Sequence, residues 1–135
     1  MTTANIYLRF DGDCKEAFLF YHSVIGGEVP RINRFKDMPN CPEGMEEYVM
    51  HINLPIGQNI LMGNDSLKVF GSVENQGNNY AVCLNIADEN EADRLFKGLS
   101  EGGNITTPLE KTFWDAYYDD FTDKFGIHWM VNCNS

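Results

Sequence analysis

Residues 8–27 read LRFDGDCKEAFLFYHSVIGG, and a second version of this stretch, LNIADENEADRLFKGLSEGG, occupies residues 84–103. The aligned pairs include Leu8 with Leu84 and Gly26 with Gly102, each 76 positions apart. One gapped residue is enough to align the two stretches along their whole length. A match that spans a strand, a helix start, a helix and a glycine stop rarely arises by chance. We therefore interpret the chain as two copies of one unit.

Each copy begins with an alternating strand, at residues 5–10 and 80–86, and continues as a helix. The first residues of both helices carry acids at the N-cap and N3 positions, where carboxylates take up unpaired helix N–H groups. These acids are Asp13 with Glu16 in the first copy and Asp88 with Glu91 in the second. A Gly-Gly pair follows each helix, as is typical of a left-handed C-cap.

Three further strands are predicted after each helix. They lie at residues 28–36, 47–54 and 58–63 in the first half, and at 104–107, 112–121 and 127–133 in the second. Residues 37–46, with two prolines and a glycine, are predicted to form a loop that could act as a lid. One helix cannot cover both faces of four strands. We therefore expect an α+β fold in which two βαβββ modules form a curved mixed sheet around a cavity, with the helices outside.

Composition and charge limit the possible partners. The 135 residues are 43% hydrophobic, as is usual for a globular chain, and carry a formal net charge of -10. This charge disfavours binding to nucleic acid or to an anionic membrane surface. The sequence has no run of 18 apolar residues and no signal peptide at its start, which predicts a cytoplasmic protein.

The cysteines show no spacing typical of a zinc site or a redox motif. We expect them to be reduced structural thiols. They are Cys14, Cys41, Cys83 and Cys133.

Several stretches resemble the PhnB-like branch of the vicinal oxygen chelate superfamily, which includes glyoxalase I, extradiol dioxygenases and bleomycin-resistance proteins. They are YLRFDGDCKEAFLFYHSVIGGE, RFKDMP, ILMGND, EADRLFKGLSEGG and TFWDAYYDDFTDKFGIHWMVNC, and they span nearly the whole chain. The resemblance implies one glyoxalase-like domain over residues 1–135, with module 1 at 1–66, a linker at 67–79 and module 2 at 80–135. It also implies a homodimer. Some PhnB-like domains are described as demethylubiquinone methyltransferases, but the sequence has no glycine-rich turn for a methyl-donor nucleotide.

Metalloenzymes of this superfamily bind their ion with four side chains, mostly His, Glu or Gln. The resemblance places the corresponding positions at Asn5, Leu61, Ala81 and Met130. Three of these four side chains cannot bind a divalent ion. A register shifted by one residue would bring in Tyr7, Asn59 or His128, without completing a ligand set. We therefore expect neither a metal nor another cofactor.

Strand alternation places Asn5, Tyr7 and Arg9 together on the face that lines the predicted cavity. Arg9 occupies the position of a substrate-contacting arginine in glyoxalase I, although it could instead pair with an acid on a neighbouring strand. His128 could act as a general base if a carboxylate orients it. The alternative for His128, and equally for His51, is a hydrogen-bonded wall residue. Arg9 and His128 are thus the weak catalytic candidates.

The densest aromatic cluster lies at residues 113–118, and from it we select Trp114 and Tyr117 as pocket residues. Packing in the core or at a dimer interface is the competing interpretation. The nearby acids Asp115, Asp119 and Asp120 are interpreted as a solvated strand edge, and Asp123 with Gly126 as a hairpin turn.

The leading functional hypothesis is a metal-independent binding protein for a small organic molecule. A lyase or isomerase with an absent or unusual metal site is the second hypothesis, and a dimeric scaffold without a ligand is the third. The predicted ligand-binding residues are Asn5, Tyr7, Arg9, Leu61, Ala81, Trp114, Tyr117, His128 and Met130.

Overall fold

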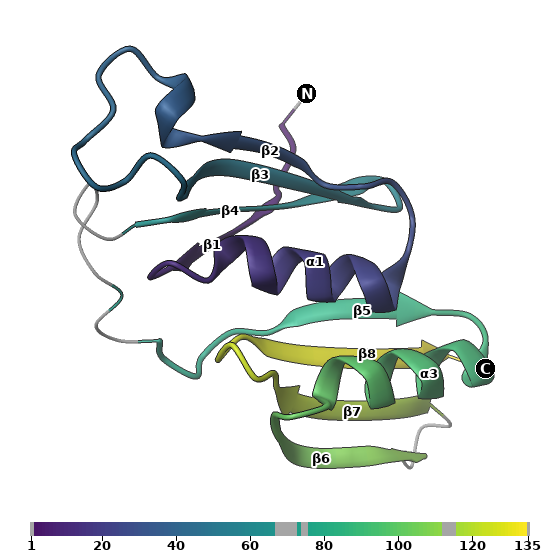
Figure 1. Ribbon diagram of the computed structural model, residues 1–135. Coiled ribbons are helices and arrows are strands. Elements are labelled where there is room, and N and C mark those ends of the chain that lie inside the picture. Colours follow the sequence, from purple (N-terminus) through teal and green to yellow (C-terminus); the bar gives the residue numbers. More distant parts are fainter. Residues whose placement is uncertain (1, 67–72, 74–75, 112–115, 135) are drawn as a thin grey trace. The chain divides into compact units, whose positions relative to one another are not determined.

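The computed structural model describes residues 2–66, 73, 76–111 and 116–134. The chain divides into two compact units, Met1–Asn75 and Gln76–Ser135, called unit 1 and unit 2 below (Figure 1). Within the residues that the structure describes, each unit shows one α-helix and one four-stranded sheet. The predicted α+β class and the duplicated βαβββ plan are therefore confirmed. The expected single domain, with its linker at 67–79 and one sheet curving around a cavity, stays a prediction.

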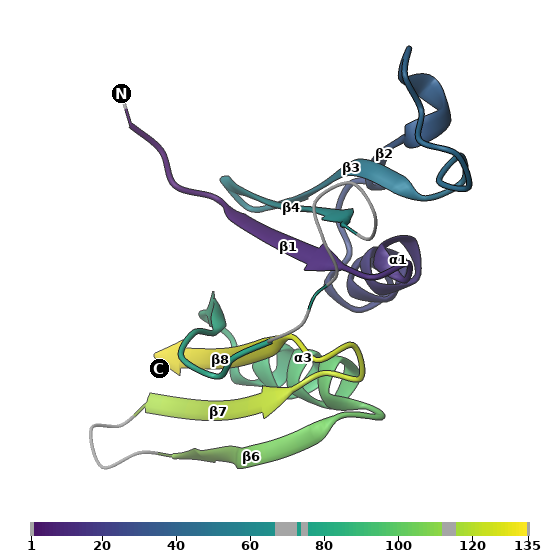
Figure 2. The same cartoon turned by 90° about the vertical axis from the view of Figure 1, so that its left-hand side faces the viewer.

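Unit 1 follows the order strand, helix, then three strands, with a short 3-10 helix inserted. Its elements are β1 (Ile6–Phe10), α1 (Cys14–Ile25), β2 (Arg31–Arg34), η1 (Phe35–Asp37), β3 (Val49–Ile56) and β4 (Asn59–Asp65). The strand order across the sheet is β1-β4-β3-β2. Strand β1 is parallel to β4, and the other pairs are antiparallel. The helix lies along one face of this sheet (Figures 1 and 2).

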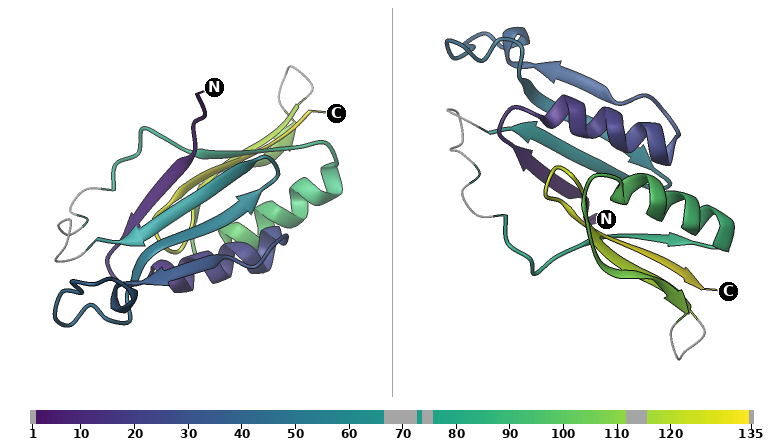
Figure 3. Two further views of the ribbon diagram at one scale, coloured as in Figure 1. Left: turned by 90° about the horizontal axis from the view of Figure 1, so that it is seen from above. Right: turned by 60° about the horizontal axis from the view of Figure 1, so that its bottom comes forward.

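Unit 2 repeats this plan. Its elements are β5 (Val82–Ile86), α3 (Glu89–Ser100), β6 (Asn104–Lys111), β7 (Ala116–Thr122) and β8 (His128–Asn134). The strand order β5-β8-β7-β6 matches that of unit 1 strand for strand, including the parallel outer pair. Figure 3 shows α3 running along the strands of its own sheet. The sequence repeat is thus a repeat of topology.

The core of unit 1 lies between α1 and one face of the sheet. The sheet contributes Leu8, Phe10, Ile52 and Leu54, and α1 contributes Ala17, Phe18 and Tyr21. Gly63 of β4 lets the helix come close, because a Cβ there would lie 2.8 Å from the Phe18 ring. The predicted alternation of β1 is confirmed from Tyr7 to Phe10, since Leu8 and Phe10 are buried while Tyr7 and Arg9 are exposed. Ile6, expected on the packed face, is 41% exposed at the start of the strand.

The core of unit 2 has the same design. Strands β7 and β8 contribute Phe121, Trp129, Val131 and Cys133, and α3 contributes Ala92, Leu95 and Leu99. In each unit, no described helix of the same unit covers the other face of the sheet. We call that uncovered side the open face of the unit.

Several strand boundaries differ from the prediction, and at two of them the strand continues through a proline. Pro55 was assigned to a turn but belongs to β3. The pairing between β3 and β2 ends at Asn53, opposite the first residue of β2, so Pro55 has no partner in β2. No β2 carbonyl therefore needs an N–H from Pro55. Pro108 was expected to end its strand at Thr107, yet β6 continues to Lys111 through a register shift at the sheet edge. Edge strands and bulges are the sites where a sheet accepts proline.

The two helix starts turn out to differ. Asp88 caps α3 as predicted, because its side chain accepts a hydrogen bond from the Asn90 N–H at 3.2 Å. Asp13 makes no such bond. The buried carboxylate of Asp65 instead accepts from the N–H groups of Gly12 and Cys14, at 2.9 and 3.1 Å. A residue at the end of β4 therefore replaces the local cap of α1.

This difference predicts unequal effects of two otherwise matched substitutions. We expect Asp88→Ala to lower the free energy of unfolding by about 1 kcal/mol, the typical value of an N-cap. Asp13→Ala serves as the control and should change it by less than about 0.5 kcal/mol, since no cap bond is lost. Urea denaturation of both variants measures the difference. Equal losses would contradict this assignment of the caps.

No helix in the described part of the chain is long and apolar enough to span a bilayer. The cytoplasmic location stays a prediction.

Candidate functional site

The open face of unit 1 carries Tyr7 and Arg9, two of the nine side chains that the sequence placed in the predicted cavity. Tyr7 of β1 is paired with Met62 of β4, which is paired with Asn53 of β3, so these three residues form one row across the sheet. Tyr7 is 41% exposed, and the other two are half-buried. Arg9 lies one step further along β1, opposite Asn64. The row mixes apolar and polar side chains, as a binding surface for organic molecules does.

A short chain of polar contacts crosses this face. The Tyr7 hydroxyl lies 3.4 Å from His51 Nδ1, and His51 Nε2 lies 2.6 Å from Asn53 Oδ1. Because an amide oxygen can only accept, Nε2 carries the proton and Nδ1 presents its lone pair toward Tyr7. Burial raises the pKa of Tyr7, and the charge of Arg9 opposes part of this rise. Tyr7 therefore stays a neutral hydroxyl that can donate a hydrogen bond at physiological pH.

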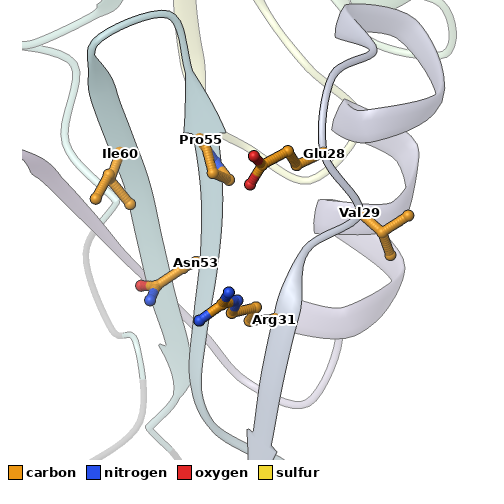
Figure 4. Close-up of a pocket in the computed structure, with 6 residues that line it drawn as sticks. All are labelled: Glu28, Val29, Arg31, Asn53, Pro55 and Ile60. Atoms are coloured by element: carbon orange, nitrogen blue, oxygen red, sulfur yellow. The ribbon is translucent and has the colours of Figure 1, made fainter.

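A hollow of ≈ 200 Å³ lies beside this polar chain. It is lined by Glu28, Val29, Arg31, Asn53, Pro55 and Ile60 (Figure 4). The residue pairs Arg31 with Asn53 and Pro55 with Ile60 are opposite each other in the sheet. The hollow thus belongs to the same open face, and Asn53 is common to the hollow and the polar chain.

The register assumed for β4 was wrong by one residue. Leu61 was aligned with Met130, but its side chain is only 2% exposed and faces α1 together with Leu54, its partner in the sheet. Met130 is opposite Cys83 in unit 2, just as Met62 is opposite Tyr7 in unit 1. Met62 is therefore the counterpart of Met130. The assumed register aligned Gly57 with Gly126, and it failed because the β3–β4 and β7–β8 turns differ in length.

The open face of unit 2 satisfies most of its polar groups internally. Ala81, Cys83 and Asn85 share this face on and beside β5, and Asn85 Oδ1 accepts from Asn132 Nδ2 at 3.2 Å. Tyr118 donates to Asp120 Oδ2 at 3.2 Å. Burial, followed by the nearby carboxylate of Asp119, raises the pKa of the Cys83 thiol. This thiol is therefore a poor nucleophile.

His128 is held on both sides of its ring. Its Nε2 lies 2.8 Å from the carbonyl oxygen of Gly77, and its Nδ1 lies 2.8 Å from Thr122 Oγ1. The Tyr80 ring packs edge-on against it, with ring centroids 5.2 Å apart. In a neutral ring Nε2 donates, and the Nδ1 lone pair receives the Thr122 hydroxyl proton. This geometry is that of a hydrogen-bonded wall residue, the alternative considered for His128.

The aromatic cluster is only partly described. Trp114 lies outside the described residues. Tyr117 is paired with the buried Cys133 and shares its face of the sheet with Phe121, under α3. Tyr118 lies on the open face instead. The alternation of residues along β7 places the two tyrosines on opposite faces of the sheet. The sequence of the cluster does not show which of them faces α3, because that depends on the strand register.

The four positions at which the superfamily holds a metal ion do not fit one here. Asn5 Oδ1 accepts a hydrogen bond from the Ile60 N–H at 3.2 Å, and Leu61, Ala81 and Met130 offer no oxygen or nitrogen ligand. Within the described ranges, no three His, Cys, Asp or Glu side chains gather as a metal ion requires. We derive no chemical step through a metal at these residues.

Comparisons with known proteins match the whole chain. A family model described as 3-demethylubiquinone-9 3-methyltransferase matches residues 2–132. The crystal structure of protein PA1353 from Pseudomonas aeruginosa is 37% identical, covers 99% of this chain and 98% of its own, and has a TM-score of 0.88. A putative 3-demethylubiquinone-9 3-methyltransferase, PhnB protein, from Bacillus cereus is 22% identical, with coverages of 98% and 99% and a TM-score of 0.77.

A glyoxalase/bleomycin resistance protein/dioxygenase family enzyme from Burkholderia phytofirmans PsJN is 15% identical, with coverages of 98% and 100% and a TM-score of 0.63. At identities of 22% and 15%, the Bacillus and Burkholderia structures share the fold. The activities in their names apply to those proteins.

Proposed function

The chain belongs to the family described as 3-demethylubiquinone-9 3-methyltransferase, and from this premise we propose that it is a metal-independent protein that binds a small organic molecule. The resemblance to the PhnB-like branch of the vicinal oxygen chelate superfamily is confirmed by the family match and the shared fold. Fold and family leave the ligand open. The open face of unit 1 supports the proposed binding function.

The observation that carries the proposal is the polar chain Tyr7–His51–Asn53 beside the hollow. Its contact between Tyr7 and His51 is long, at 3.4 Å, so a ligand oxygen could replace it with little loss. In addition, the buried Asn64 Oδ1 opposite Arg9 has no hydrogen-bond partner among the described residues. One unsatisfied polar atom on the face that also carries Met62 and Ile60 suits a ligand that is mostly apolar with a few polar groups.

The N-terminus of α1 disfavours a phosphate-bearing nucleotide. Sites for such nucleotides use the N–H groups at the start of the first helix to bind phosphate. Here Asp65 already accepts from Gly12 and Cys14, and its other oxygen accepts from the Val49 N–H at 2.9 Å. A second anion at this helix start would be repelled by the buried carboxylate.

The proposed ligand contacts follow from this placement. In unit 1 they are Asn5, Tyr7 and Arg9, with Met62 in place of Leu61. Ala81, His128 and Met130 of unit 2 remain proposed contacts, as does Trp114. Tyr117 is withdrawn because it shares the α3 face of the sheet with Phe121. The homodimer and the cytoplasmic location also remain predictions.

A ligand screen tests the proposal. We expect aromatic or other hydroxylated organic compounds to raise the melting temperature of the metal-free protein, because a ligand at 100 times its Kd stabilises the folded state by about 2.7 kcal/mol. Asn53→Ala should weaken binding of a hit about tenfold or more, the value of one hydrogen bond of about 1.4 kcal/mol. Asn90→Ala, on α3 in unit 2, is the control and should bind normally.

Two results would argue against this proposal. One is a stoichiometric divalent metal in protein purified without chelator, measured by elemental analysis. The other is binding of every hit with full affinity by Asn53→Ala.

The same polar chain favours one alternative, an enzyme of the lyase or isomerase type. A histidine oriented by Asn53 through one nitrogen and facing Tyr7 with the other is arranged for proton transfer. Among the histidines considered as bases, His51 fits this role better than His128, whose Nδ1 is engaged by Thr122 at 2.8 Å. Conversion of a bound hit over time, abolished in His51→Gln, would establish this alternative, whereas recovery of the unchanged compound supports binding alone.

A further inference from the structure

The hollow of unit 1 combines one acidic and one basic side chain with apolar lining residues. Glu28 and Arg31 line it together with Asn53, Pro55 and Ile60. We propose that this hollow binds the ammonium and carboxylate groups of a small zwitterion, as found in amino acids and betaines. The inference rests on the proposed function, because the hollow would hold the zwitterionic end of the same organic ligand.

The local sequence fixes the separation of the two charges. Arg31 is the first residue of β2, where its pairing with Asn53 holds its backbone. Glu28 precedes it by three residues, and the buried Pro30 lies between them with a restricted φ angle. Both charged side chains extend toward β3, Glu28 toward Pro55 and Arg31 toward Asn53 (Figure 4). The hollow therefore has an acidic end and a basic end.

Neither charge is paired within the described part of the chain, although pairing is common nearby. Arg34, on the same strand as Arg31, forms an ion pair with Glu47 at 3.7 Å, and Lys36 pairs with the same glutamate at 3.2 Å. No ion pair of Glu28 or Arg31 is found among the described residues. A guanidinium and a carboxylate left unpaired beside one hollow can each take a counter-charge from a ligand.

The size and the charge of the protein narrow the ligand class. At ≈ 200 Å³ the hollow is smaller than typical ligand pockets of about 300–1,000 Å³, so it fits a head group rather than a whole metabolite. The net charge of -10 opposes the approach of a simple anion over most of the surface. A zwitterion has no net charge, so this long-range repulsion does not act on it. It can still bind Arg31 through its carboxylate and Glu28 through its ammonium group.

An NMR titration of the full chain tests the inference with glycine, acetate and methylammonium as probes. We expect glycine to shift the amide signals of Arg31, Asn53 and Ile60 in a saturable manner at millimolar concentration. Acetate and methylammonium should each bind at least tenfold more weakly, because each makes one of the two charge contacts. Arg31→Gln and Glu28→Gln should each weaken glycine binding by at least tenfold. Arg34 lies outside the hollow, so Arg34→Gln should leave glycine binding unchanged.

Three outcomes would overturn the inference. They are the absence of saturable shifts with glycine, equal binding of acetate alone, and full glycine binding in both hollow variants. Unchanged signals of α1 and β1, in the same unit as the hollow, show that each variant is folded. A hit from the ligand screen that binds normally to Arg31→Gln and Glu28→Gln would overturn this inference and leave the proposed function standing. Glycine binding without any hit in the ligand screen would support a zwitterion site in the hollow. The same result would count against the proposed function of binding a small organic molecule.

Discussion

Replacement of Asp123 by alanine is expected to lower the free energy of unfolding by about 3–5 kcal/mol, because three donors lose their acceptor and each buried unsatisfied donor costs about 1–3 kcal/mol. One carboxylate oxygen of Asp123 accepts from the N–H groups of Phe125 and Ile127, at 2.8 and 3.0 Å. The other accepts from the indole N–H of Trp129 at 2.8 Å. Asp123 is 3% exposed, so water cannot fully replace these bonds. Urea denaturation monitored by tryptophan fluorescence measures the loss.

Asp123→Asn provides a graded comparison for this prediction. Asparagine keeps one oxygen for the two turn N–H groups but cannot accept from Trp129 with its amide nitrogen. We therefore expect a loss of about 1–3 kcal/mol, the cost of one unsatisfied buried donor. If alanine and asparagine were both tolerated with losses below about 1 kcal/mol, the turn and the indole would not depend on this carboxylate.

Asp65 plays a comparable part in unit 1, but its hydrogen-bond partners could not be predicted from the sequence. The role of Asp123 was predicted because its donors follow within a few positions, as turn chemistry requires. Asp65 accepts from Gly12, Cys14 and Val49, which are 16 to 53 positions away. No local pattern identifies such partners. The duplicated topology was predictable because periodicity and caps are local, whereas the cap of α1 is made by tertiary structure.

The candidate site was predicted to a similar extent. Alternation along β1 correctly placed Tyr7 and Arg9 on the open face, since one strand fixes its own parity. Leu61 was misplaced because a one-residue slip moves a side chain to the opposite face of the sheet. The link from His51 to Tyr7 and Asn53 joins β1 to β3, which are not neighbours in the sheet. Predicting such a link requires the strand order, which cannot be read directly from the sequence.

Asp119 is expected to make the protein less stable as the pH rises from about 4 to about 7. The interpretation of Asp119 as part of a solvated strand edge was wrong, because its side chain is completely buried and β7 lies inside the sheet. Its Oδ2 has no hydrogen-bond partner among the described residues. Burial raises its pKa to about 7, the hydrogen bond from the Val131 N–H opposes this rise, and the neighbouring Asp120 adds to it. The folded state therefore retains a proton that the unfolded chain, with an ordinary carboxyl pKa near 3.8, has already released.

The direction of the effect follows from proton binding. Between these two pKa values the folded state binds more protons than the unfolded state, so stability is greatest below about pH 4 for this group and declines until the folded pKa is passed. Each tenfold change in proton affinity corresponds to about 1.4 kcal/mol, so ionised Asp119 costs the folded state up to about 4 kcal/mol above pH 7. Other groups contribute to the measured curve, and burial of Asp13 raises its pKa in the same direction.

Asp119→Asn isolates the contribution of this one carboxyl. Asparagine can still accept the Val131 N–H, which Asp119 binds at 2.8 Å, but it has no proton to lose. We expect the variant to lack the decline between pH 4 and 7 and to be about 1–3 kcal/mol more stable than the natural sequence at pH 8, because its amide still buries an incompletely paired group. Urea denaturation at a series of pH values compares the two proteins. If the plots of unfolding free energy against pH are parallel for the two proteins, Asp119 is ionised at no measurable cost. If the two plots converge at low pH, this buried carboxyl is the titrating group.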